Sequence, residues 1–389
     1  LKAYYYFELA KRYGGGPLIH RVYADQKEAN LPRGTFDEVV GLILREIEGV
    51  RNELVVDWRA ENLEEKSGRI TRGAALALKS RVLLYAASPQ FNPSGEKSKW
   101  AAAAFEVINM GIYSLHPDYG GLFVAETSTT SPETIWAVRI GATNEFERKN
   151  YPIGTQGGGT GICPSQNLVE AYESTGEDTD DAYAGLDPRF YATVLRNGDT
   201  WNGRTLEIYA GGADDPARQN ASPTGYYLRK FLNENLNLTN DDKRLRSWIV
   251  FRYAEILLNF AEAMNEAYGP DDAHGYGMSA RDAVDAVRAR SGVGMPPVDV
   301  DPGDAAAMRT AIKHERRIEL AFEDHRYWDL RRWDDAGTVL NRPLRGVKVT
   351  RSGDGFAYTP FEAPKMNLYP IPQAEIVKSG GVLDQNPGW

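Results

Sequence analysis

The sequence predicts a mainly α-helical protein that carries a large, loop-rich insertion with short strands. Amphipathic segments with helix start and stop signals lie on both sides of residues 112–243. Residues 112–243 themselves are rich in Gly, Pro, Asn, Asp and Thr, which favour turns and loops. We therefore expect one domain with a helical scaffold (1–111 and 244–335), the insertion (112–243) and an irregular C-terminal segment (336–389).

Four helices are expected in the first part of the chain, over residues 1–13, 35–50, 70–88 and 98–110. The first is stopped by the run of three glycines and a proline that ends at Pro17. The second begins at Thr35, and Glu38 completes a capping box with it. The third ends before Pro89, because the residue before a proline disfavours the helical conformation.

The insertion contains two strand-like segments, residues 134–140 and 190–195, which are rich in β-branched and aromatic side chains. Helices are then expected over residues 246–268, 278–291 and 304–323. Strand-like pieces follow in the segment after about residue 335.

Two helix pairs have similar patterns. Residues 74–85 are followed by 100–110, and residues 253–268 are followed by 280–290. Each pair has small residues where the helices would touch, a Gly or Pro turn, and then an Ala-rich helix. The pattern resembles tetratricopeptide units, in which one helix pair buries its apolar face only by stacking on neighbouring pairs. A generic helical hairpin would show the same pattern, and this alternative stays open.

Residues 314–333 form the most unusual stretch, with five acidic residues, five arginines, two histidines and four aromatic residues. Arg316 and Glu319 fall one helical turn apart, which favours an ion pair. Glu315, Glu319 and Glu323 form a row of like charge that needs cations close by. We expect a structural segment in which buried guanidinium groups pair with carboxylates and stack on rings.

A zinc site at the start of this segment is rejected. His314-Glu315 resembles the beginning of a zinc-protease helix, but Ile318 stands where the second histidine is required. The sequence therefore predicts no metal site and no cofactor.

Composition excludes several classes of protein. The chain has 389 residues and a net charge of −9, which argues against nucleic-acid binding because that requires a basic face. No run of about 18 apolar residues is present.

Cys163 is the only cysteine, so an internal disulfide is impossible, and we expect an inert thiol. Because residues 1–13 already read as the interior of a helix, we expect further residues before Leu1.

The insertion also contains the candidate ligand-binding residues. Aromatic side chains offer flat apolar area to the C–H face of a sugar ring, and neighbouring amide and guanidinium groups hydrogen-bond its polar rim. The candidate residues are Tyr151, Tyr183, Trp201, Tyr209, Asn144, Asn202 and Arg204, with Trp58 outside the insertion. Trp201 is the foremost candidate, because it lies between glycines among polar neighbours. The alternative for each ring is that it only holds a loop in place.

Taken together, several segments resemble the SusD/RagB family of surface nutrient-binding lipoproteins. They include Arg252-Tyr-Ala-Glu-Ile-Leu-Leu258, Leu368-Tyr-Pro-Ile-Pro-Gln-Ala-Glu375, the terminal Gln385-Asn-Pro-Gly-Trp389 and residues 5–18, 73–86, 164–173, 187–191, 287–293 and 315–333. Asp324 departs from the pattern, since a glycine is usual there, but aspartate tolerates a left-handed backbone better than most residues.

This resemblance implies a function. Similar proteins bind glycans without catalysis and pass them to a SusC-like TonB-dependent transporter in the outer membrane. It also implies a cell-surface location through a lipid anchor, which would lie outside this chain. Two alternatives remain: a peptide-binding member of the same family, and a glycoside hydrolase, which requires a pair of carboxylates across a cleft.

Overall fold

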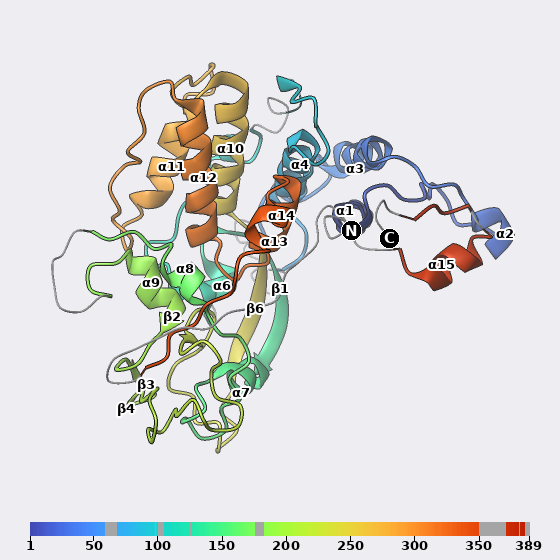
Figure 1. Cartoon of the computed structure of the whole chain (residues 1–389). Helices are drawn as coiled ribbons and strands as arrows, with labels where there is room; N and C mark the ends of the chain where they lie inside the picture. Colours follow the sequence, from blue (N-terminus) through green and yellow to red (C-terminus); the bar gives the residue numbers. More distant parts are fainter. Residues whose placement is uncertain are drawn as a thin grey trace.

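The computed structural model of the protein describes residues 1–58, 68–97, 99, 105–124, 127–175, 183–349, 371–380 and 382–385. Its long helices form two groups of neighbours (Figure 1). One group contains α1 (Lys2–Tyr13), α3 (Phe36–Val50) and α4 (Arg72–Ala87), and the other contains α10 (Tyr253–Tyr268), α11 (Ala280–Arg288) and α12 (Ala305–Glu319). Helix α4 also packs against α10, which joins the two groups.

The helices of the first group form where the sequence predicts them. The capping box at the start of α3 is present, with Thr35 accepting from the Glu38 backbone N–H and Glu38 accepting from the Thr35 backbone N–H. Helix α1 ends at Gly14, which has a positive φ of 79°. The helix predicted over 98–110 lies largely outside the described residues, which include the 3₁₀ turn η2 (Ile108–Met110) near its end.

The second group confirms the predicted pair over residues 253–268 and 280–290, because α10 and α11 pack against each other. A capping box formed by Ser279 and Asp282 begins α11. Ala254, Ala261 and Ala283 are among the small residues buried in the shared core, as expected for close helix contacts.

A long two-stranded antiparallel ribbon crosses the molecule. The predicted strand over 134–140 is confirmed as β1 (Thr134–Thr143), which pairs with β6 (Arg244–Arg252) in a register that places Val138 opposite Trp248. The prediction that a helix begins at residue 246 is wrong. Residues 248–251 read Trp-Ile-Val-Phe, which favours strand, and their hydrogen bonds go to β1 instead of along a helix.

The predicted strand over residues 190–195 is also largely wrong. Asp187 caps a short helix, α9 (Pro188–Thr193), and Pro188 occupies its first turn, where a missing N–H costs nothing. Only β2 (Val194–Leu195) is a strand, and it pairs with β5 (Tyr227–Leu228).

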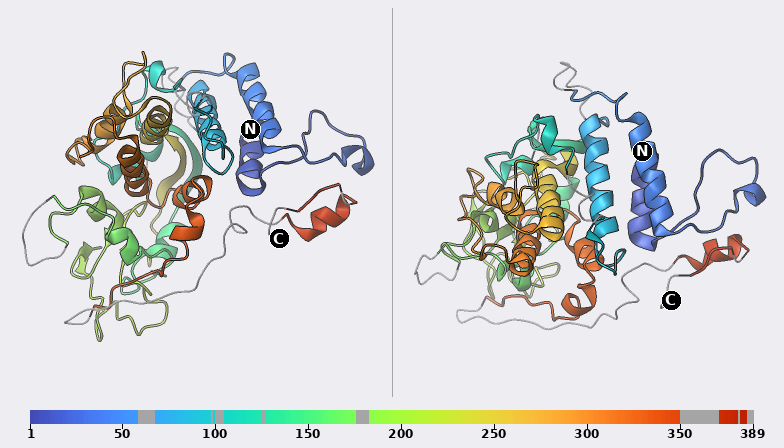
Figure 2. Two further views of the ribbon diagram at one scale, coloured as in Figure 1. Left: turned by 45° about the horizontal axis from the view of Figure 1, so that its top comes forward. Right: turned by 90° about the horizontal axis from the view of Figure 1, so that it is seen from above.

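The remaining elements are short. They are α2 (Gln26–Ala29), η3 (Gly121–Phe123), α6 (Thr127–Thr130), α7 (Glu145–Asn150), α8 (Gln166–Val169), β3 (Thr200–Trp201), β4 (Arg204–Thr205), α13 (Arg326–Arg332), α14 (Ala336–Val339) and α15 (Gln373–Lys378). Strands were expected after about residue 335, but the described part of that segment contains the helices α14 and α15. Helices α2 and α15 lie near each other on an arm that extends away from the two helix groups (Figures 1 and 2). The Asn30 amide donates to the Ser379 carbonyl across this arm, at 2.6 Å.

The described part of residues 112–243, called the loop region below, has a hydrophobic core of its own. Its members are widely spaced in the sequence and include Tyr151, Leu195, Trp201, Leu206, Ile208, Tyr227, Leu232, Leu236 and Leu238. Separate cores lie between α1, α3 and α4 and between α10, α11 and α12. The loop region is therefore a packed structure, and packing in this core decides which of its side chains are left at the surface.

The predicted row of glutamates holds the loop region to the helices. Glu315, Glu319 and Glu323 are buried or nearly so, and each is paired with at least two cations, which confirms that the row needs positive charge nearby. The cations come from other elements of the fold: Arg189 in α9, Lys230, Arg252 at the end of β6, Arg288 in α11 and Arg290.

Glu319 is the centre of this network. Its two oxygens accept hydrogen bonds from Arg189 at 2.9 Å, Arg252 at 2.7 Å and Arg290 at 2.6 Å, and all four side chains are buried. Burial alone would raise the pKa of Glu319, but the charges of Arg290, Arg252 and Arg189 hold that pKa well below its usual value.

A second group of buried charges follows α12. Arg316 donates to Asp329, at 3.1 and 3.2 Å, and to Asn259 at 2.7 Å, instead of forming the expected pair with Glu319. Arg332 pairs with Glu262 and lies over the ring of Trp333, 4.6 Å from its centroid, so the predicted combination of buried ion pair and ring stacking is confirmed.

The turn between α12 and α13 explains how aspartate replaces a glycine. Asp324 has a φ of 64°, in the left-handed region that the sequence predicted for this position. Phe322 also has a positive φ, 63°, so the chain reverses sharply just beyond the buried glutamate row.

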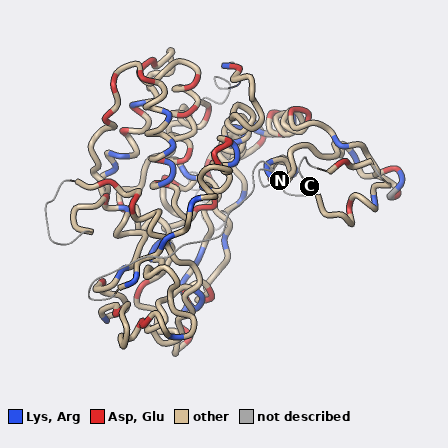
Figure 3. The backbone as a smooth tube through the Cα atoms, in the orientation of Figure 1, with Lys and Arg blue, Asp and Glu red and all other residues tan. Residues whose placement is uncertain are grey.

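Lys and Arg positions are interspersed with Asp and Glu positions throughout the fold (Figure 3). This mixed pattern agrees with the acidic net charge in disfavouring a nucleic-acid partner. In the described part of the chain, no helix combines the length and the apolar character needed to cross a membrane.

We expect the stability of the protein to fall as the pH is lowered from about 4.5 towards 2, partly through Glu255. Burial alone would raise the pKa of this carboxyl, but its two hydrogen bonds from Arg81, both 2.6 Å, and the nearby positive charge lower the pKa to about 2. A group whose pKa is depressed by folding stabilises the protein above its unfolded pKa and loses that effect as the pH falls through the folded pKa. The loss should be roughly 3 kcal/mol.

Urea unfolding between pH 7 and pH 2 measures this effect. Glu255→Gln should be less stable at pH 7 and should lose less stability on acidification than the wild type. Glu46→Gln is the matched control, because Glu46 pairs with Lys2 on the surface. Equal pH slopes for Glu255→Gln and the wild type would contradict the assignment.

Candidate ligand-binding surface

The structure corrects the foremost candidate. Trp201 is only 1 % exposed, and its ring meets Tyr151 edge to face with centroids 5.3 Å apart. Tyr151 is buried too, and its hydroxyl donates to the Asn233 carbonyl. The expectation that these two rings face a ligand is wrong, because both belong to the core of the loop region.

Asn144 and Asn202 organise the backbone of the loop region. Asn144 is buried and donates to Asp241 at 2.9 Å and to the Asp242 carbonyl at 2.8 Å, so its amide is used inside the loop region and is not presented at the surface. Asn202 has a positive φ of 48° in the turn between β3 and β4, and its side-chain oxygen accepts from the backbone N–H of Asn235. Its Nδ2 donates to the Leu236 carbonyl at 3.4 Å, and the residue as a whole is partly exposed.

Arg204 forms a bidentate pair with the buried Asp214, with both distances 2.7 Å. Burial alone would raise the pKa of Asp214, but hydrogen bonds from Arg204 and from the backbone N–H groups of Glu207 and Gly154 lower it below its ordinary value. The pair fixes the turn that contains Arg204, and the guanidinium itself is partly exposed.

Tyr209 is 38 % exposed on the loop region, so its contact with a ligand stays a prediction. Tyr183 is half-buried: it stacks on Phe190, and its hydroxyl forms a hydrogen bond with that of Tyr226 at 2.7 Å. Sequence reasoning missed Tyr191, whose ring is 36 % exposed. Its neighbour Phe190 on the same helix, α9, is buried.

Trp58 lies outside the loop region and is half-buried. It lines a small cavity of about 30 Å³ together with Trp136, whose indole N–H donates to the Gly68 carbonyl at 3.0 Å. This cavity is too small for a sugar ring. Any contact of Trp58 with a ligand would therefore be at the surface.

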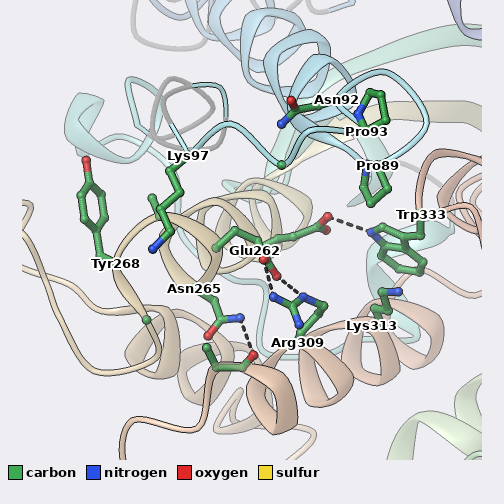
Figure 4. Close-up of a pocket in the computed structure, with 15 residues that line it drawn as sticks. Pro89, Asn92, Pro93, Lys97, Glu262, Asn265, Tyr268, Arg309, Lys313 and Trp333 are labelled. Carbon is green, nitrogen blue, oxygen red and sulfur yellow. Dashed lines mark hydrogen bonds and ion pairs between the residues drawn. The ribbon is translucent and has the colours of Figure 1, made fainter.

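A larger recess of about 590 Å³ lies on the helical side of the molecule (Figure 4). Its walls are the turn that follows α4, the C-terminal part of α10, the start of α12 and Trp333. Its volume is in the usual range for small-molecule sites. Tyr268 and Lys97 lie on one side of the recess and Trp333 lies on the other, with Glu262 between them (Figure 4).

Ion pairs and hydrogen bonds fix most polar groups of this recess. Arg309 forms a bidentate pair with Glu266, and Lys313 pairs with Asp335 at 2.7 Å. The Trp333 indole N–H donates to Glu262 at 2.8 Å. The sequence did not identify this recess, because its walls come from segments that are far apart in the chain.

Among the described residues, no group of three or more His, Cys, Asp or Glu side chains could hold a metal ion. The thiol of Cys163 is partly buried, and burial raises its pKa, so the thiolate is disfavoured at neutral pH. The structural features thus define a helical scaffold protein whose loop region is fixed by buried ion pairs.

Comparisons with known proteins identify the family. Residues 132–389 match the model of the SusD family, and the chain belongs to this family. It is 27% identical over 383 residues to the SusD-like protein P38 of Formosa agariphila, covering 90% of this chain and 68% of that protein. It is 24% identical over 400 residues to the SusD-like protein P2 of the same organism, covering 100% of this chain and 72% of that protein. The resemblance inferred from sequence segments is therefore confirmed.

Solved structures agree. A SusD-like protein from Bacteroides fragilis superposes with a TM-score of 0.81 at 30% identity, covering 100% of this chain and 78% of that chain. A second structure, of a SusD-like carbohydrate-binding protein from the same species, also has a TM-score of 0.81. It is 25% identical and covers 97% of this chain and 77% of that chain. The expected fold, a helical scaffold with some short strands, is confirmed.

Proposed function

We propose that the protein binds glycans at the cell surface, without cleaving them, and delivers them to a SusC-like TonB-dependent transporter in the outer membrane. The observation that carries the proposal is its similarity, over 97% of its length, to the carbohydrate-binding SusD-like protein from Bacteroides fragilis. The family resemblance also implies a lipid anchor, and attachment to the outer membrane through such an anchor is part of the proposal.

The exposed rings of the loop region support glycan binding. Tyr209 and Tyr191 each present roughly a third or more of their surface to solvent. Flat rings of this kind stack on the apolar face of a sugar at little entropic cost, because a tyrosine side chain has few rotatable bonds. Tyr183, Asn202 and Arg204 are partly accessible in the same region and supply polar groups for the rim of the sugar.

The rigidity of this surface supports a binding role as well. Buried ion pairs to Glu315 and Glu319 hold α9, which carries Tyr191, against α12. A surface that is ordered before the ligand arrives loses less conformational entropy on binding. We therefore expect modest affinities to come from few contacts on a fixed frame.

A binding screen against plant, host and microbial polysaccharides tests this proposal. For a polysaccharide that binds the wild type, we expect Tyr209→Ala and Tyr191→Ala each to weaken binding about tenfold, which is ~1.4 kcal/mol. Tyr5→Ala is the control, because Tyr5 is an even more exposed tyrosine (67 %) on α1, away from the loop region.

Three outcomes would contradict parts of the proposal. Binding of peptides in place of glycans would reject the cargo. Shortening of a bound glycan during incubation with catalytic amounts of protein would reject the non-catalytic role. Failure to isolate a large barrel protein with the native protein from membranes would reject delivery to a transporter.

A further inference from the structure

We propose that the recess between the turn after α4, α10 and α12 is a second binding site, for a sugar unit that carries a carboxylate, such as a uronic acid. The sugar chemistry of this ligand rests on the proposed function. The site itself rests on an acceptor, a cation and two rings that line one cavity of about 590 Å³ (Figure 4).

Asn265 provides the acceptor. Its side chain is only 2 % exposed and lines the recess, and its Nδ2 donates to the Ala305 carbonyl at 2.9 Å. Because only the NH₂ group can donate to a carbonyl, this bond fixes which end of the amide is the oxygen. Oδ1 has no hydrogen-bond partner among the described residues. A buried amide oxygen of this kind favours a ligand that brings an O–H or N–H donor.

Lys97 provides the cation. Its side chain extends over the recess (Figure 4), and no ion pair of Lys97 occurs within the described part of the chain. The other two cations of the lining, Arg309 and Lys313, are each paired with a carboxylate. Lys97 is therefore the group that remains to attract a negative charge, although the protein as a whole has a net charge of −9.

The rings and the size of the recess favour a cyclic ligand. Tyr268 is held in place by His274, whose ring stacks on it with centroids 3.6 Å apart and an interplanar angle of 14°. Trp333 closes the opposite side of the recess; it is only 5 % exposed, and its indole N–H donates to Glu262. The accessible part of the Tyr268 ring, together with the cation and the acceptor that line the same cavity, matches a sugar ring that bears hydroxyl and carboxylate groups.

Calorimetric titration with glucuronate, glucose and acetate tests the inference. We expect glucuronate to bind the wild type about tenfold more tightly than glucose does, and acetate not to bind. Lys97→Gln should remove the difference between glucuronate and glucose and leave glucose binding unchanged. Lys99→Gln is the matched control, because Lys99 is directed towards Asp37 instead of the recess.

A second variant tests the acceptor and the position of the site. Asn265→Ala should weaken both glucuronate and glucose about tenfold, and a thermal melt run in parallel shows whether the variant is folded. If Asn265→Ala does not fold, Tyr268→Ala replaces it and should weaken both sugars to a similar extent.

The inference is overturned if glucuronate and glucose bind the wild type equally, if Lys97→Gln binds glucuronate like the wild type, or if acetate binds as well as glucuronate. Failure of the proposed function gives a different result. Tyr209→Ala should retain glucuronate binding in the recess. The effect of Tyr209→Ala on polysaccharide binding therefore tests the proposed role of the loop region and not the recess.

Discussion

Replacing Glu319 by glutamine should lower the free energy of unfolding by about 3–5 kcal/mol, the range seen when one partner of a buried ion pair is removed. Arg189, Arg252 and Arg290 converge on this one carboxylate, and all three guanidinium groups are buried. Glutamine has nearly the same shape but no charge, and its NH₂ group would face a donor. Three buried positive charges would then lose part of their compensation.

Equilibrium unfolding in urea at pH 7, followed by circular dichroism, measures this loss. Glu46→Gln is the control, because Glu46 and its partner Lys2 have side chains that are 35% and 40% exposed, and such pairs contribute about 1 kcal/mol or less. A change below about 1 kcal/mol for Glu319→Gln would show that the network does not hold the loop region in place.

The features that could be predicted from the sequence are those encoded over short distances in the chain. Helices α1, α3 and α4 follow from periodicity and from their capping and stop signals. The glutamate row could also be predicted as a demand for cations, because Glu315, Glu319 and Glu323 are four residues apart. Its partners could not be named, since the arginines come from segments up to about 130 residues earlier.

Strand β6 shows why other elements were missed. Residues 248–251 form a short apolar run directly before α10, and such a run is ambiguous between helix and strand when only its periodicity is considered. Its strand partner β1 lies far earlier in the chain, and the pairing decides the conformation. The helix was therefore predicted to begin too early.

The prediction of the candidate site failed in part for the same reason, because contacts between distant segments decide which side chains are buried. The interpretation of Trp201 as exposed relied on its polar sequence neighbours, Asn197, Asp199 and Asn202. The apolar residues that cover it, such as Leu206 and Leu236, are single residues scattered among polar ones. Only the fold brings them together. Tyr209, by contrast, is 38 % exposed and is followed closely by Gly211 and Gly212.

Replacing Trp201 by alanine should cost about 3–5 kcal/mol of stability, as expected for the loss of a large buried aromatic side chain. The ring fills the core of the loop region against Tyr151 and is 1 % exposed, so its removal leaves a cavity that the surrounding loops fill only in part. Trp201→Phe should cost less, because it retains an aromatic ring there. Tyr209→Ala is the control and should change stability by about 0.5 kcal/mol or less, because that ring lies at the surface.

Urea unfolding together with glycan binding separates a core role of Trp201 from a ligand-contact role. If Trp201 is a core residue, Trp201→Ala lowers the free energy of unfolding, and Trp201→Phe, which restores packing, should also restore any glycan binding that Trp201→Ala had lost. If Trp201 contacts the ligand, Trp201→Ala should weaken glycan binding without lowering the free energy of unfolding. If Trp201→Ala were as stable as the wild type but failed to bind a glycan, the ring would have to reach the surface, and its burial against Tyr151 would not describe the binding-competent protein.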